Sequence, residues 1–223
     1  MPIEQDLPPP PKKPMLNFCH SQDCSFFPKG LNSMSQIYYY MASLSKENNV
    51  LELILENSPL KEWHFEEIVR EAKVTKAVAN KWIKKYVKSS LLKKIKEKGK
   101  FPHFTAGKDN TVYHSLKRIY ALERLHESGL IPKLMSLKNA KSIVLFGSLS
   151  RGDWYKESDI DIFIYGGIGD FDKSAYELKL GKHIELHIFQ NKEEIREVKT
   201  GLIKNVINGY VIKGNVQEIA EAA

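Results

Sequence analysis

Two short apolar segments separated by a polar turn form the strongest pattern in the second half of the chain. Residues 143–146 (IVLF) make a continuous apolar run that suits one buried strand and is too short for a helix. Gly147 ends this run. Residues 159–164 (DIDIFI) then alternate, which predicts a second strand. Because successive side chains of a strand point to opposite faces, we expect Asp159 and Asp161 on one face, with Cα atoms roughly 7 Å apart.

This strand-turn-strand unit combines the two kinds of group that bind a metal-triphosphate. Two carboxylates on one face can share hard cations, and a pair of Mg²⁺ ions about 4 Å apart commonly serves phosphoryl displacement. Gly147 allows the backbone to approach an anion, Ser148 adds a hydroxyl and Arg151 adds a positive charge. We therefore expect Asp159 and Asp161 to bind two Mg²⁺ ions. The expected triphosphate ligands are Gly147, Ser148 and Arg151.

Spacing excludes two other motifs, and the pattern that remains resembles a known family. A P-loop requires Lys and then Ser or Thr after its second glycine, whereas Asp153 follows Gly152. A nucleophile elbow requires glycine two positions before and after a serine, which neither Ser148 nor Ser150 has. The sequence LFGSLSRG, followed ten residues after Gly-Ser by DIDI, resembles the signature of the DNA polymerase β-like nucleotidyltransferases. The alternative is an ordinary hairpin with solvated aspartates.

The resemblance implies a third acid on a neighbouring strand, which completes the metal site or accepts the proton of the incoming hydroxyl. Residues 183–189 (HIELHIF) predict that strand, with its isoleucine and leucine positions against helices. Glu185 is then the expected third catalytic and metal-binding carboxylate, although members of the family often carry Asp here. His187 on the same face is the alternative proton acceptor, and a solvated glutamate is a third alternative.

The remaining C-terminal residues predict a small mixed sheet. Residues 171–180 are expected to form a helix that ends at Gly181, residues 193–205 another helix, and residues 210–212 a strand. This order suggests helices on one face of the sheet and the acids on its uncovered face.

The pattern in the N-terminal half predicts three helices and a hairpin. Apolar positions recur at helical spacing in residues 50–55 and 65–72, and Thr75 can cap a third helix. Residues 91–95 and 101–105 would form the hairpin, with the basic tip Lys98-Gly99-Lys100. This order is typical of a winged-helix DNA-binding domain, whose third helix enters the major groove. The buried stripe of that helix would be Ala79, Trp82, Ile83, Tyr86 and Val87.

Positive charge is concentrated in this part of the chain. Twelve basic residues lie between Arg70 and Lys100, against only Glu71 and Glu97. Such a concentration on one face suggests contacts with DNA phosphates. The alternatives are a solvated helix face and a winged helix that docks on a protein. The expected DNA contacts are Lys76, Asn80, Lys81, Lys84, Lys85, Lys98 and Lys100.

Connecting helices are expected between the two halves. Asp109-Asn110 can cap a helix that closes at Ser128-Gly129, and residues 130–137 continue as another. This region resembles the linker of archaeal winged-helix nucleotidyltransferases. The expected domains are a leader (1–45), a winged helix (46–108), connecting helices (109–138), a nucleotidyltransferase domain (139–215) and a tail (216–223).

Composition is that of a soluble globular protein, at 42% hydrophobic and 27% charged residues, and the net charge of +7 favours polyanionic partners. The proline-rich leader is expected to be extended or poorly ordered. Cys19 and Cys24 do not suggest a disulfide scaffold, and with His20 they supply only half a zinc site. With no signal peptide and no apolar run long enough to cross a bilayer, we expect a cytoplasmic protein with no membrane partner.

The resemblance implies an α+β enzyme in which helices join an N-terminal winged helix to a small polymerase β-like nucleotidyltransferase domain. Its expected reaction is Mg²⁺-dependent transfer of a nucleoside monophosphate from an NTP, with ATP the expected one, to an acceptor. A protein side chain, an RNA end and a small molecule are all open as the acceptor. The alternative is a DNA-binding transcriptional regulator, or an antitoxin-like protein, whose nucleotidyltransferase domain serves as a sensor or docking unit.

Overall fold

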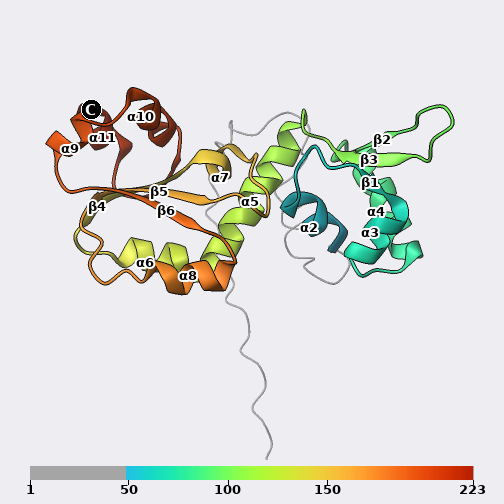
Figure 1. The fold of residues 1–223 in the computed structure, drawn as a ribbon, viewed down its shortest axis with the longest axis horizontal. Helices are drawn as coiled ribbons and strands as arrows, with labels where there is room; N and C mark the ends of the chain where they lie inside the picture. The colour runs from blue at the N-terminus through green and yellow to red at the C-terminus, as the bar shows by residue number, and fades with distance from the viewer. Residues whose placement is uncertain (1–48, 223) are drawn as a thin grey trace, which may run out of the picture. The chain divides into compact units, whose positions relative to one another are not determined.

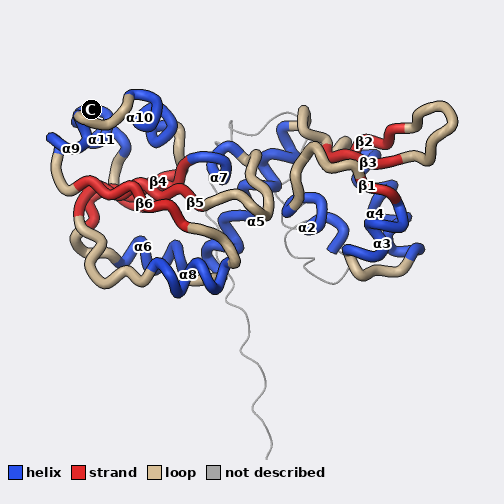
Figure 2. Tube along the Cα trace, in the orientation of Figure 1, coloured by secondary structure: helices blue, strands red, loops and turns tan. Residues whose placement is uncertain are grey.

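Two separate sheets organise the protein, whose computed structural model describes residues 49–222 (Figure 1). The predicted leader, the half zinc site of Cys19, His20 and Cys24, and the residues before Asn49 lie outside this range. The described residues divide into an N-terminal group of helices with a three-stranded sheet and a C-terminal four-stranded sheet with its own helices (Figure 2).

The N-terminal group follows the predicted order of three helices and a hairpin. Thr75 caps the third helix, α4, because its hydroxyl accepts a hydrogen bond from Val78 N at 3.3 Å. The stripe at Ala79, Trp82 and Ile83 is buried as expected, while Val87 is only half-buried. The elements are α2 (Asn49–Glu56), α3 (Phe65–Glu71), α4 (Lys76–Lys88), β2 (Leu92–Ile95) and β3 (His103–Ala106).

A third strand, β1 (Trp63–His64), joins this hairpin and was not predicted. It pairs antiparallel with β3, with Trp63 opposite Phe104, and Trp63 is 2% exposed. Two residues are too few to show an alternating pattern, so only the pairing with a distant segment identifies this strand.

Two helices connect the sheets and end where the sequence predicted. Asn110 caps α5 (Thr111–Glu127), since its side chain accepts a hydrogen bond from Val112 N at 2.9 Å. The helix ends at Glu127 with Ser128 as its C-cap, and Gly129 takes a positive φ of 82° before α6 (Leu130–Ser136) begins.

The C-terminal sheet has the strand order β6-β5-β4-β7 and is mixed, as expected. β4 pairs antiparallel with both β5 and β7, whereas β5 and β6 run parallel. This arrangement places Phe146 opposite Asp161, and Asp161 opposite Glu185. The strands are β4 (Ala140–Phe146), β5 (Ile160–Gly166), β6 (Ile184–Phe189) and β7 (Tyr210–Lys213).

Helices cover both faces of this sheet, so the prediction that one face is uncovered is wrong. On one face, Val144, Phe163 and Tyr165 pack against buried residues of the last three helices, among them Ile195 and Ile219. The isoleucines of β5, which alternate with Phe163 and Tyr165, are also buried, and Figure 1 shows α6 and α8 on the side of the sheet away from α10 and α11. The central strands β4 and β5 therefore bury apolar residues on both sides, whereas the edge strands β6 and β7 are more exposed. The covering helices are α8 (Lys173–Leu180), α9 (Lys192–Arg196), α10 (Thr200–Ile207) and α11 (Val216–Ala222).

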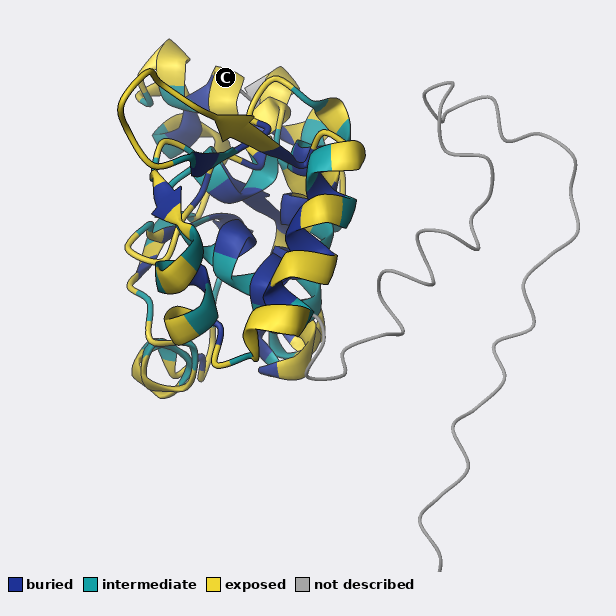
Figure 3. Cartoon of the chain, turned by 90° about the vertical axis from the view of Figure 1, so that its right-hand side faces the viewer, coloured by how far each residue is buried: buried dark blue, intermediate teal, exposed yellow. Residues whose placement is uncertain are grey.

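Two details of these helices differ from expectation. The helix predicted over residues 193–205 is divided into α9 and α10, and Val198 between them packs against the core. Residues 216–222, expected to be a tail, form α11, in which Ile219 is fully buried. In the view of Figure 3, several helices have buried residues on the side that faces the interior and exposed residues on the outer side. No helix among residues 49–222 combines the length and apolar character needed to cross a bilayer.

Candidate functional site

The Gly-Ser motif forms a single helical turn, α7 (Gly147–Arg151), directly after β4. Gly147 has a φ of +71°, a conformation that side chains with a Cβ rarely adopt. A Cβ at this position would also overlap the Asp161 carboxylate oxygen Oδ2. Glycine therefore allows the chain to turn and lets Asp161 lie directly against the backbone of the motif.

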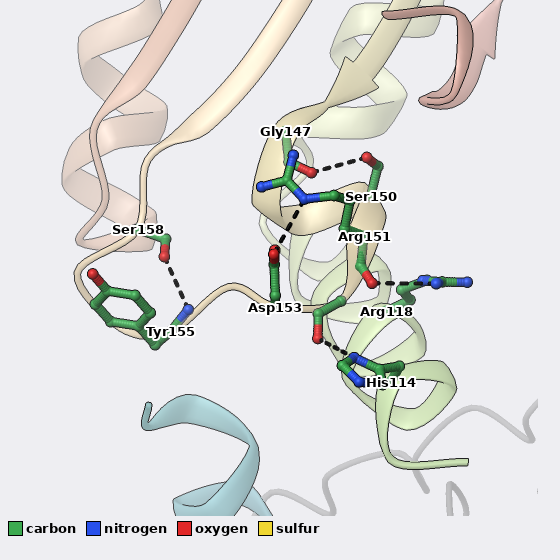
Figure 4. A network of polar contacts seen from close by, with 9 residues as sticks. His114, Arg118, Gly147, Ser150, Arg151, Asp153, Tyr155 and Ser158 are labelled. Carbon is green, nitrogen blue, oxygen red and sulfur yellow. Dashed lines mark hydrogen bonds and ion pairs between the residues drawn. The ribbon is translucent and has the colours of Figure 1, made fainter. Parts of the chain in front are cut away.

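Hydrogen bonds within the turn hold its shape (Figure 4). Ser150 Oγ donates to Gly147 O at 3.0 Å, as Figure 4 shows. Gly152 N donates to Ser148 O at 3.0 Å. Asp153 N donates to the same Ser148 oxygen at 3.2 Å. The Ser148 hydroxyl, expected to bind phosphate, belongs to a half-buried residue at the second position of the turn.

Side chains of α5 hold the same turn from outside (Figure 4). Arg118 donates to Arg151 O at 3.2 Å, and His114 Nδ1 lies 3.0 Å from Gly152 O. The guanidinium of Arg151 pairs with Asp153, with Nε 3.1 Å from Oδ2, and both side chains are about half exposed. Arg151 is therefore positioned by its neighbours. To contact a phosphate, its guanidinium would have to bind the phosphate and Asp153 together or break the ion pair with Asp153.

Three potential metal ligands meet beside this turn. Asp161 on β5 and Glu185 and His187 on β6 each place one ligand atom within 4.8 Å of the others. His187 Nε2 lies 3.4 Å from Glu185 Oε1. Partial burial, followed by the charge of Glu185, raises the pKa of Asp161. A cation bound here would offset both effects, since they disfavour a bare carboxylate.

Asp159 stands one residue before β5 and is exposed. Its charge also raises the pKa of Asp161, but its carboxylate is not part of the group of three. Of the expected acids, the structure thus brings together Asp161 and Glu185, with His187 beside them.

The donors in this group suit a divalent cation. Carboxylate oxygens are the ligands that Mg²⁺ prefers, and imidazole is a ligand of transition-metal ions. The overlap that any Cβ at Gly147 would make with Asp161 shows how closely the Gly-Ser turn adjoins this group. The residues present therefore fit a divalent metal ion.

The expected DNA contacts lie on two elements of the N-terminal group. Lys76, Asn80, Lys81, Lys84 and Lys85 are on α4, while Lys98 and Lys100 are in the loop between β2 and β3. Some of their charges are engaged within the protein. Lys76 pairs with Glu66 at 2.8 Å, and Lys100 pairs with Glu97 at 2.6 Å.

Lys117 on α5 is a residue near the motif that the sequence did not single out. Its side chain is fully buried, and Nζ donates to Asn57 O at 3.2 Å. Burial lowers its pKa to about 8. Its own carbonyl accepts a hydrogen bond from Trp154 Nε1 at 3.1 Å, in the loop that follows the Gly-Ser turn. In the sequence, the one sign that Lys117 is buried is its spacing of four residues from Tyr113 and from Ala121, which lie on the buried face of α5.

Comparison with known proteins agrees with this geometry. Residues 128–213 match the model of the family described as nucleotidyltransferase domain. A protein of Methanocaldococcus jannaschii that carries the name of a protein adenylyltransferase is 34% identical over 107 residues, covering 47% of this chain and 95% of the relative. A second protein of that organism with the same name is 62% identical over 32 residues, which is 14% of this chain and 31% of the relative.

A solved structure also resembles the chain at low similarity. It is a toxin-antitoxin crystal structure with AMP-PNP, at 22% identity and a TM-score of 0.30, covering 48% of this chain and 80% of that chain. The family match, over residues 128–213, includes the Gly147 turn and the three residues Asp161, Glu185 and His187. The chain therefore belongs to the nucleotidyltransferase family of the DNA polymerase β-like superfamily, and it is a nucleotidyltransferase.

Proposed function

We propose that the protein transfers a nucleoside monophosphate from ATP to a hydroxyl group of a protein acceptor, with release of pyrophosphate. The observation that carries this proposal is the meeting of Asp161, Glu185 and His187 beside the Gly147 turn. The names of the M. jannaschii relatives support ATP as the donor and protein as the acceptor class. An RNA end or a small molecule would be a different outcome of the same experiment.

The proposed roles divide between donor binding and charge neutralisation. Gly147, Ser148 and Arg151 would bind the triphosphate, and Asp159, Asp161 and Glu185 would bind two Mg²⁺ ions. Bound Mg²⁺ supplies charge neutralisation at the reacting phosphate. The acceptor oxygen forms a bond to the α-phosphorus while the bond from that phosphorus to pyrophosphate breaks. The hydroxyl proton passes to a basic group of the site, for which Glu185 is the candidate.

The proposal includes a winged helix that binds DNA. It is supported by the sequence of three helices with a three-stranded antiparallel sheet in residues 49–106, and by the lysines of α4 and the β2–β3 loop. DNA binding would place the enzyme near a chromosomal or regulatory site. Because charge alone carries no sequence specificity, the proposed lysine contacts are with DNA phosphates.

The transfer is tested by incubating the full chain with each α-labelled NTP in a lysate and determining which fraction carries label. Asp161→Asn should abolish labelling without unfolding the protein, because it removes a negative ligand and keeps the shape of the side chain. Asp170→Asn is the matched control, since Asp170 is an exposed aspartate in the loop after β5. Undiminished labelling by Asp161→Asn at ordinary Mg²⁺ would contradict the proposed function.

A further inference from the structure

His187 is held in place on the same face of β6 as Glu185, two residues earlier. Phe163 of β5 lies opposite it in the sheet register. The ring of Phe146 packs on the imidazole with centroids 5.2 Å apart and an angle of 58° between the planes. The His187 side chain is 22% exposed. The imidazole is therefore packed on one side and reaches solvent at the site on the other.

The position of Nε2 is that of a ligand atom. Atoms bound to one cation by bonds of about 2.1 Å lie roughly 3 to 4.2 Å apart, depending on whether they are neighbours or opposite each other. Nε2 is 3.4 Å from Glu185 Oε1, and the group including Asp161 spans no more than 4.8 Å. Small side-chain rotations therefore suffice to bring all three atoms onto one ion.

We propose that His187 is a ligand of the active-site metal, so that the site favours a transition-metal ion such as Mn²⁺ over Mg²⁺. The inference rests on the proposed function, because it concerns the same site. Mg²⁺ prefers oxygen ligands in a near-ideal octahedron, whereas divalent transition metals also accept imidazole nitrogen. Two carboxylates and one imidazole therefore discriminate between these ions, as three carboxylates would not.

Two other roles for His187 give different results in the same measurements. As a proton acceptor alone, it would affect transfer and leave metal affinity unchanged. As the partner of Glu185 in an ion pair, it would alter the affinity for Mn²⁺ and Mg²⁺ by similar factors. Only a nitrogen ligand changes the ratio of the two affinities.

The test measures binding of Mn²⁺ and of Mg²⁺ to the full chain by calorimetry, without nucleotide. His187→Gln should weaken Mn²⁺ binding by about tenfold or more, since even the loss of a group that supports a ligand costs that much. Mg²⁺ affinity should change much less, so the preference for Mn²⁺ should fall. His183→Gln is the matched control, because His183 lies just before the same strand and contacts Glu177 at 2.7 Å instead. That variant should keep the preference of the wild type.

A second measurement avoids the risk that His187→Gln unfolds the protein. Pulsed electron paramagnetic resonance of Mn²⁺ bound to the wild-type chain should detect coupling to an imidazole ¹⁴N nucleus. Absence of that coupling, or an unchanged Mn²⁺ to Mg²⁺ affinity ratio in folded His187→Gln, would overturn the inference. Either result would overturn only the role of His187, because transfer that depends on Asp161 would remain possible. If Mn²⁺ has a nitrogen ligand but the protein shows no transfer at all, only the proposed function is contradicted.

Discussion

At the scale of single residues, the close contact between Gly147 and Asp161 links the two halves of the motif. Glycine in such a turn is usually explained by the close approach of its backbone to a bound phosphate. Here the first atom that a side chain at Gly147 would meet is Asp161 Oδ2. The glycine is therefore required by the position of the Asp161 carboxylate even before a nucleotide is bound.

Gly147→Ala tests this requirement. The variant should lose most transfer activity, and it should lose about 1–2 kcal/mol in free energy of unfolding from the positive φ alone. Gly181→Ala is the control because Gly181 has a φ of +63° with no atom near the position of a Cβ. Both variants carry the backbone strain, but only Gly147→Ala displaces Asp161. Equal transfer activity in both, measured with labelled ATP beside denaturant unfolding curves, would show that the contact with Asp161 does not matter.

At the scale of elements, α4 has one buried face and one face with most of its lysines exposed. The buried face includes Trp82, on whose ring the Lys85 Nζ lies 4.5 Å from the centroid. This arrangement keeps the helix packed by its aromatic side while lysines such as Lys84 face outward. A face of this kind can contact phosphates without any change in the packing of the helix.

Reversing Lys81 and Lys84 to Glu should weaken binding to all DNA duplexes by a similar factor. If each lysine neutralises one phosphate, the slope of log affinity against log salt should become shallower by about 1.8, at about 0.9 per phosphate. Fluorescence anisotropy over a salt series measures both quantities. A variant with Lys199 and Lys204 reversed has the same change in net charge on the C-terminal part, and it should keep the wild-type slope. Failure of the wild type to bind DNA at low salt would favour the protein-docking alternative.

At the scale of the whole molecule, the end of α2 contacts the loop that follows the Gly147 turn. Lys156 N donates to Glu56 O at 2.7 Å, and Tyr120 donates to the Glu56 carboxylate at 2.7 Å. Trp154 stacks on Tyr120 with parallel rings whose centroids are 6.1 Å apart. Buried Lys117 lies among these groups, 5.1 Å from the Trp154 ring and bonded to Asn57 O.

The lowered pKa of Lys117 predicts a pH dependence of stability. Between about pH 8 and the unfolded value of 10.5, the unfolded chain keeps a proton that folded Lys117 has lost. The free energy of unfolding should therefore rise with pH in that window, by up to about 3 kcal/mol in the limit. Below pH 8 Lys117 is charged in the folded protein, so the whole free-energy cost of burying that charge lowers the stability.

Lys117→Met isolates this effect, because methionine has a side chain of similar length that fills the buried site without a titrating group. The stability of the wild type relative to Lys117→Met should increase from pH 8 to pH 10, as measured by urea unfolding at each pH. Lys138→Met, at an exposed lysine, is the control and should show no such trend relative to the wild type. A difference between wild type and Lys117→Met that is constant with pH would contradict the lowered pKa.

Local patterns in the sequence predicted most elements and the central motif. Strand β6 was expected over residues 183–189 and is found over Ile184–Phe189, and the caps Thr75 and Asn110 are confirmed. These features depend on periodicity and on hydrogen bonds between near neighbours, which the order of residues specifies. The same alternation placed Glu185 and His187 on one face of their strand.

Contacts between distant segments were decided only by the tertiary structure. The register of β5 against β6 determines that Asp161 meets Glu185 and His187, with Asp159 outside the group. Strand pairing also identified β1, and packing of α9 to α11 covered the face expected to be open. The sequence alone determined which residues could carry the chemistry, because side-chain type and alternation are local. Which of them meet depends on register and burial, which arise from contacts between segments far apart in the chain.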